Sequence, residues 1–192
     1  MKTLIIAIVA FVLGGITMAP AQQPELPSTE KEHQWLNQFA GEWTSVSQSV
    51  AYDDQPATKC TGAMKSRMLG EFWIINEITG DMGGSSVDAI QTIGYDADKK
   101  QYIGTWVDSM MNHLWRYEGT VDANGKKFVL LADGPNFMSD GKLTKFRDSY
   151  EFKTPDTIIT TSEMMGDDGK WLTFMSGEMT RKTADKPAKS TP

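Results

Sequence analysis

The fold is decided at Gly41-Glu42-Trp43, where a helical pattern ends and a β-type pattern begins. On the N-terminal side, Thr29 and Glu32 have the spacing of a capping box, which predicts the start of a short amphipathic helix. Gly41 tolerates positive φ, so it ends that helix. After Trp43 the hydrophobic pattern has a period of two, and no helical pattern interrupts it. We therefore expect a helix that leads directly into a sheet.

About ten β-type segments follow, separated by residues that are typical of tight turns. These segments are 43–52, 58–69, 72–82, 87–95, 101–108, 113–121, 127–133, 143–153, 157–165 and 171–181. The turn chemistry is clearest at residues 96–98, 122–125 and 167–169, which are rich in Asp, Asn and Gly. Such short links force neighbouring strands to be antiparallel.

This pattern predicts an all-β fold, an antiparallel up-and-down β-barrel with the N-terminal helix plugging one end. The strand spacing excludes α/β folds, and a two-sheet sandwich is the alternative. Within residues 72–79, Ile74 and Asn76 share one side of the strand, while Trp73 and Glu77 share the other. Neither side is purely polar, so the pattern leaves open which side faces the lumen.

The N-terminus has the features of a secretory signal peptide: Lys2, an apolar run over residues 4–16 and small residues ending at Ala21. The apolar run is shorter than the roughly twenty residues that a membrane-spanning helix needs. We expect cleavage near Ala21 and export to the periplasm or the extracellular space. We then expect a linker at 22–29, one barrel domain at 30–181 and a disordered tail at 182–192.

The composition restricts the partners. The net charge is −6 and the basic residues form no stripe, which argues against nucleic acid or an anionic membrane surface as the main partner. Cys60 is the only cysteine, so the chain has no internal disulfide, and we expect Cys60 to be a small buried residue.

Several segments resemble one protein family. They are 33–36 (His-Gln-Trp-Leu), 41–43, 93–96 (Ile-Gly-Tyr-Asp) and 104–115, followed by Tyr117-Glu118-Gly119. Together they resemble a mostly bacterial family called domain of unknown function 1579, over roughly residues 30–181. The resemblance implies a calycin-like barrel, similar in plan to lipocalins and fatty-acid-binding proteins, with no established activity. Gly41-x-Trp43 also resembles the first-strand motif of lipocalins, which implies that Trp43 packs across the closed end.

The segment 106–117 is the densest in side chains suited to binding. The ligand-binding candidates of the whole chain are Trp73, Trp106, His113, Trp115, Arg116 and Tyr117. If His113, Trp115 and Tyr117 point inward, they form an aromatic wall for a flat apolar ligand. If Arg116 points inward instead, it suits a carboxylate ligand. The structural alternative for His113 is a hydrogen bond to a backbone carbonyl.

The sequence contains no complete catalytic or metal-binding motif. Glu77, Asp108 and Glu118 would form a general acid and base pair only if they converged inside the barrel. Two histidines are too few for a three-histidine zinc centre, so no metal site is predicted. We predict no cofactor, although haem with His113 as an axial ligand stays open.

The leading hypothesis is therefore an exported, non-enzymatic barrel that binds a small apolar or amphipathic molecule. One alternative is a hydrolase-like or haem-linked enzyme that uses His113 and barrel carboxylates. Another is a filled barrel that contacts a protein partner through the loop at 134–141, which carries Phe137 and Met138.

Overall fold

The structure, a computed structural model, describes residues 27–51, 56–138 and 141–183. In this part of the chain ten antiparallel strands form one closed barrel, because β1 pairs with β10 and every other pair joins sequence neighbours. The strands are β1 (Gly41–Ser49), β2 (Lys59–Leu69), β3 (Trp73–Met82), β4 (Ser86–Asp96), β5 (Gln101–Asp108), β6 (Trp115–Val121), β7 (Lys127–Pro135), β8 (Leu143–Thr154), β9 (Thr157–Met165) and β10 (Trp171–Arg181). The predicted barrel is confirmed and the sandwich alternative is wrong.

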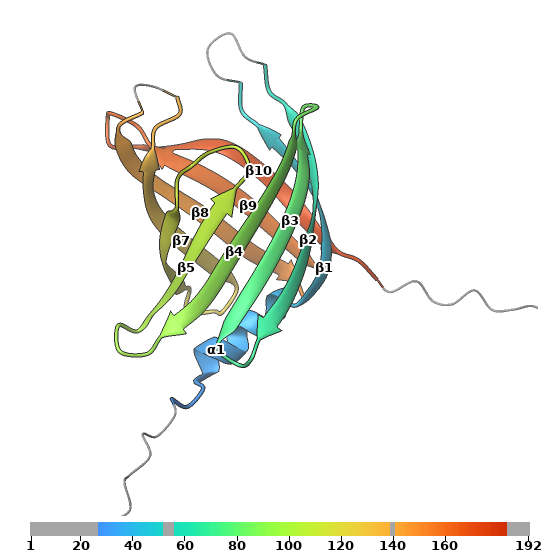
Figure 1. Cartoon of the computed structure of the whole chain (residues 1–192), viewed down its shortest axis with the longest axis vertical. Coiled ribbons are helices and arrows are strands. Elements are labelled where there is room, and N and C mark those ends of the chain that lie inside the picture. Colours follow the sequence, from blue (N-terminus) through green and yellow to red (C-terminus); the bar gives the residue numbers. More distant parts are fainter. Residues whose placement is uncertain (1–26, 52–55, 139–140, 184–192) are drawn as a thin grey trace, which may run out of the picture.

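A short helical segment lies across the lower end of the barrel (Figure 1). It consists of α1 (Lys31–Leu36) and a 3₁₀ turn (Asn37–Phe39). Gly41 has φ of 124° and starts β1, which confirms its predicted role at the end of the helix. The predicted capping box of Thr29 and Glu32 is wrong. Glu30 is the N-cap residue instead, and the Nδ1 atom of His33 accepts its backbone N–H at 3.0 Å.

The predicted strands match the observed ones to within a few residues at each end. The match is close because each tight turn depends on a few neighbouring residues, and these residues can be recognised in the sequence. Gly125 and Gly169 adopt φ of 70° and 75° in two of the predicted turns, as hairpins require. Among the residues that the structure describes, Lys100 in the turn after β4 is the one non-glycine residue with a positive φ, which is 53°.

Hydrogen bonds and ring contacts attach the plug to the barrel wall. The Trp43 side chain is fully buried and its Nε1 atom donates to the carbonyl of Phe39 at 2.8 Å, which confirms the predicted packing at the closed end. The indole of Trp35 donates to the carbonyl of Gly125 at 2.9 Å, in the hairpin between β6 and β7. These contacts therefore fix the helix at the closed end of the barrel.

The lower half of the lumen is filled with apolar side chains. Leu36 and Phe39 from the plug meet Phe128 and Ile158 from the wall, and all four are essentially inaccessible to water. Burial on this scale accounts for much of the stability of the fold. Cys60 is buried in the wall, as predicted. The predictions for residues 1–21, and for most of the linker and tail, lie outside the described residues.

Candidate functional site

A chain of polar side chains crosses the lumen above this apolar core. Asn76 of β3 donates from Nδ2 to the Oε1 atom of Gln91 of β4 at 2.8 Å. The Nε2 atom of Gln91 then donates to the hydroxyl of Tyr150 of β8 at 3.2 Å. Because three strands separate β4 from β8 on the nearer side, this contact spans the inside of the barrel. The chain forms a floor between the apolar core and the upper lumen.

A carboxyl group lies in the wall next to this floor. Asp148 of β8 accepts a hydrogen bond from the Ser162 hydroxyl at 2.6 Å and another from the Tyr117 hydroxyl at 2.9 Å. Burial raises the pKa of Asp148, and these two hydrogen bonds oppose that rise only in part. Burial, followed by the nearby Asp148 charge, also raises the pKa of Tyr117 well above its ordinary value. Tyr117 therefore remains a hydrogen-bond donor at neutral pH.

Several inward-facing residues at and above the floor are only partly buried. Asp148 and Tyr150 are enclosed by protein, yet both keep accessible surface. Further inward-facing residues of the upper and middle lumen are also partly accessible: Ser45, Ser47, Gly62, Gly80, Thr160, Ser162, Met175 and Gly177. Most of these side chains are small. This part of the wall therefore projects little side-chain volume into the upper lumen.

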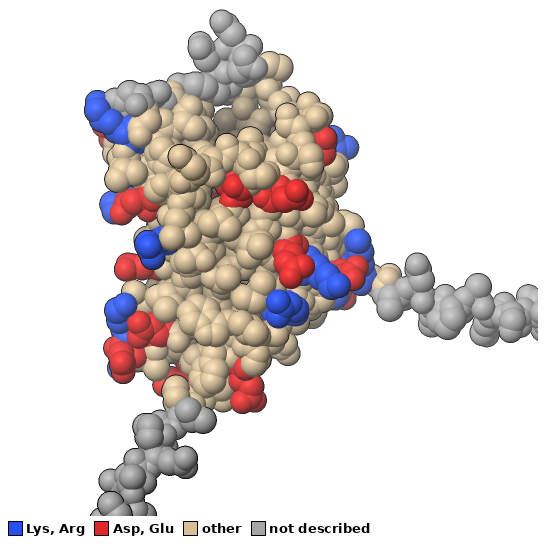
Figure 2. All heavy atoms as spheres, viewed as in Figure 1, with Lys and Arg blue, Asp and Glu red and all other residues tan. Residues whose placement is uncertain are grey.

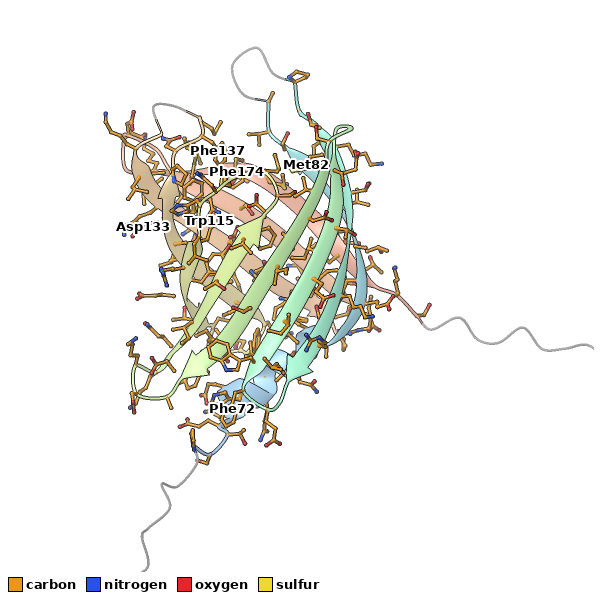
Figure 3. The ribbon with its side chains drawn as sticks, in the orientation of Figure 1. Phe72, Met82, Trp115, Asp133, Phe137 and Phe174 are labelled. Atoms are coloured by element: carbon orange, nitrogen blue, oxygen red, sulfur yellow. The ribbon has the colours of Figure 1, made fainter. Side chains whose placement is uncertain are left out.

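The opposite wall carries a cluster of aromatic rings near the mouth, at the end away from α1. The ring of Trp115 packs edge to face on Phe146 at 4.8 Å between centroids. Phe137, from the loop after β7, packs on Phe174 of β10 at 5.2 Å. Figure 3 shows Trp115, Phe137 and Phe174 together at the upper end of the barrel. We call Trp115, Phe137, Phe146 and Phe174 the mouth cluster.

The loop between β5 and β6 is held at the mouth by Asp108. One oxygen of Asp108 accepts the Trp106 indole N–H at 2.8 Å, and the other accepts the backbone N–H groups of Met110 and Met111 at 2.8 and 3.1 Å. His113 in the same loop lies against the ring of Trp115 at 4.9 Å between centroids. These contacts fix the side chains of Trp106 and Trp115, which lie on either side of this loop.

The structure separates the six predicted ligand-binding residues into three groups. Trp106, Trp115 and Tyr117 point into the barrel. His113 lies at the mouth, with its Nε2 atom 3.1 Å from the carbonyl oxygen of Asp133, which is the structural role considered for it.

Trp73 and Arg116 lie on the outer face, so neither lines the lumen and the alternative of an inward-pointing Arg116 is wrong. Both strands are regular at these positions, and their inward neighbours Ile74 and Tyr117 force Trp73 and Arg116 outward. Both residues instead line a shallow groove of about 670 Å³ on the outside of the sheet, together with Trp171. A carboxylate ligand therefore has no Arg116 to meet inside the barrel.

The carboxylates considered for catalysis do not converge. Glu77 is exposed and lies 3.9 Å from Arg67 on the outer face, and Glu118 is also exposed. Asp108 alone of the three points inward, and its oxygens are occupied by the loop. Among the residues that the structure describes, no group of His, Cys, Asp and Glu has the arrangement of a metal site. The expectation of no cofactor stays a prediction, with haem as its open alternative.

Sequence reasoning missed the polar residues of the lumen, above all Asp148. A signal for it exists in β8, because Asp148 is in phase with Phe146, Tyr150 and Phe152. A carboxylate at the apolar phase of a strand is unusual, since burying a charge is costly. The partners of Asp148 lie 14 and 31 residues away in sequence, so the pattern could not reveal them.

The comparisons with known proteins give the family of the chain and support its fold. The family model described as "Protein of unknown function (DUF1579)" matches residues 28–181. The chain belongs to the DUF1579 family. This confirms the resemblance seen in the sequence. No curated protein is similar enough to this DUF1579 protein to suggest an activity.

Solved structures support the fold of this DUF1579 protein. The S-type phycobiliprotein lyase CPES from Guillardia theta has a TM-score of 0.53 and 15% identity, covering 82% of this chain and 99% of that chain. Rv2717c from M. tuberculosis has a TM-score of 0.60 and 11% identity, covering 81% of this chain and 100% of that chain. At these identities the similarity shows a shared fold alone. No helix in the described part of the chain has the length and apolar character needed to span a membrane.

Proposed function

We propose that this protein is an exported, non-enzymatic carrier that holds a small apolar or amphipathic molecule in the upper half of its barrel. The observation that carries this proposal is the set of small, partly accessible side chains that face inward between the polar floor and the mouth cluster. A barrel that served only as a scaffold would gain stability by filling this space with apolar side chains. The charged start and apolar run of residues 1–21 support export.

The geometry fits binding better than catalysis. His113 contacts Trp115 and a backbone carbonyl, whereas Asp148 contacts Ser162 and Tyr117. A general acid and base must both reach the same reacting atoms, and no described contact joins His113 to a carboxylate of the lumen. Aromatic and small apolar side chains around a few polar groups are the usual lining of a site for a small molecule.

Native mass spectrometry tests the proposal directly. The protein is purified from the organism that encodes it, and its native mass is compared with the mass of the denatured chain. We expect excess mass that disappears on denaturation. In parallel, the protein should bind the neutral apolar dye N-phenyl-1-naphthylamine, with an increase in dye fluorescence.

Two variants locate the bound molecule. Ser47 points into the lumen and is partly accessible, whereas the next residue, Gln48, points out of the same strand. Ser47→Phe should fill the lumen and abolish dye binding, while Gln48→Phe should bind dye as the wild type does. The proposal fails if the wild type carries no excess mass and binds no dye. It also fails if the two variants bind dye equally well.

A further inference from the structure

The charged residues of the barrel are distributed unevenly between its two faces. Among the described strands, Arg181 is the one basic residue in the inward phase, and its guanidinium is held at the closed end of the barrel, over the ring of Trp43. Figure 2 shows lysine and arginine side chains spread over the outside of the molecule, interspersed with acidic ones. The inward-facing acidic residues of these strands are Asp108 and Asp148. Above the apolar core, these strands therefore supply carboxyl groups to the lumen and no basic side chain.

The two inward-facing carboxylates differ in what they leave available. Asp108 accepts three hydrogen bonds from its own loop and from Trp106, so its acceptor capacity is largely used. Asp148 accepts one hydrogen bond on each oxygen, from Ser162 and Tyr117. An ionised carboxylate has about four lone-pair sites, so each oxygen of Asp148 retains capacity for a further donor.

Asp148 is also uncompensated in charge. None of the described cationic side chains lies within ion-pair distance of it, and its two partners are neutral hydroxyls. A buried carboxylate without a cation costs free energy that a filled apolar core would avoid. The raised pKa of Asp148 expresses the same cost. Asp148 is in the inward phase of β8 and is only partly buried as a residue, so a cation bound in the lumen would approach it from that side.

We propose that the lumen selects an amphipathic cation, whose positively charged head binds Asp148 and whose apolar part lies against the mouth cluster. This inference rests on the proposed function and specifies the ligand class. Tyr150, whose hydroxyl accepts from Gln91 in the floor, is the next inward-facing residue after Asp148 along β8. Fatty acids and other anionic amphiphiles are disfavoured, since their carboxylate would meet Asp148 as a like charge, and the described strands place no arginine in the lumen above the apolar core.

Three probes of equal chain length test this selection. Dodecylamine, dodecanol and dodecanoate differ in charge at neutral pH but share one apolar tail. Each is titrated, below its micelle concentration, against the protein carrying N-phenyl-1-naphthylamine, and displacement of the dye is followed by fluorescence. We expect the amine to bind at least about tenfold more tightly than either the alcohol or the carboxylate.

Variants assign the selectivity to one residue. Asp148→Asn should weaken dodecylamine binding by about tenfold and leave dodecanol binding unchanged. Glu118→Gln removes an exposed charge from the outer face and should leave all three affinities unchanged. Should Asp148→Asn fail to fold, the ranking of the three probes on the wild type decides by itself.

The outcomes separate the two proposals. If the dye binds but dodecanoate or dodecanol displaces it as well as dodecylamine does, the cation selectivity is refuted and the carrier function stands. Equal effects of Asp148→Asn and Glu118→Gln would also refute the assignment to Asp148. If neither the dye nor any probe binds, the carrier function itself fails.

Discussion

Replacement of Arg181 by alanine should destabilise the barrel more than any other removal of a surface-reaching charge. Arg181 ends β10 opposite Trp43 of β1, at the seam where the barrel closes. Its guanidinium lies 4.1 Å from the centroid of the Trp43 ring and donates to the carbonyls of Gln38 and Ala40 at the end of the plug. One side chain thereby joins the seam, the plug and the closed end.

The magnitude follows from these contacts. The guanidinium also donates to the carbonyl of Pro155 at 3.0 Å and pairs with Asp156 at 2.9 Å. Hydrogen bonds to charged groups contribute roughly 1.5–3 kcal/mol each, but one guanidinium in a partly wet site delivers only part of the sum. The exposed Asp156 pair adds roughly 0–1 kcal/mol, and the stacking on Trp43 about 1 kcal/mol. We expect Arg181→Ala to lower the free energy of unfolding by about 3–4 kcal/mol.

Urea denaturation followed by tryptophan fluorescence measures this loss. Arg181→Lys keeps the charge but not the planar fork, so it should recover about 1 kcal/mol. Arg67→Ala is the matched control, because the pair of Arg67 with Glu77 is 3.9 Å long and each side chain is 55% exposed. That variant should change stability by less than about 0.5 kcal/mol. Equal losses in Arg181→Ala and Arg67→Ala would refute the reasoning.

Two further predictions concern the lumen. Burial raises the pKa of Asp148, so the folded state binds its proton more tightly than the unfolded chain does, and stability falls as pH rises from the unfolded pKa through the folded one. Tyr117 and Tyr150, which face it, have raised pKa values and stay neutral there. Asp148→Asn should flatten this decline in urea denaturation at pH 4 and 7, and an unchanged slope would contradict it. Gly134→Ala should displace Trp115 and destabilise the barrel, because the added Cβ would lie 2.0 Å from the indole ring; an unaltered near-ultraviolet circular dichroism spectrum would contradict this.

The carboxyl group of Asp148 also lowers the stability of the fold, although the proposed ligand binding depends on it. Asn at position 148 would carry no buried charge, and the folded state at neutral pH would no longer bear the cost of an uncompensated carboxylate. A buried residue that lowers the stability of the fold is more informative about function than one that stabilises the core. The proposed role of Asp148 therefore rests on its environment, and the probe titrations test it independently of stability.

The sequence by itself determined the features that depend on neighbouring residues. The strand limits, the turns and the end of the helix at Gly41 follow from local φ preferences and from a period of two, which residues a few positions apart establish together. The packing of Trp43 at the closed end was also predictable, because Trp43 directly follows the plug helix and a large apolar ring at that position packs against the plug.

Only the tertiary structure decided which face of each strand looks inward and which inward residues meet. Closure through the β1–β10 pair placed Tyr117 in the lumen and Arg116 outside, although the two are adjacent in sequence. The lumen chemistry arises where β4, β6, β8 and β9 converge on Gln91, Asp148 and their partners. Such contacts depend on strand register and barrel curvature, which are properties of the whole sheet and leave no mark on a single segment.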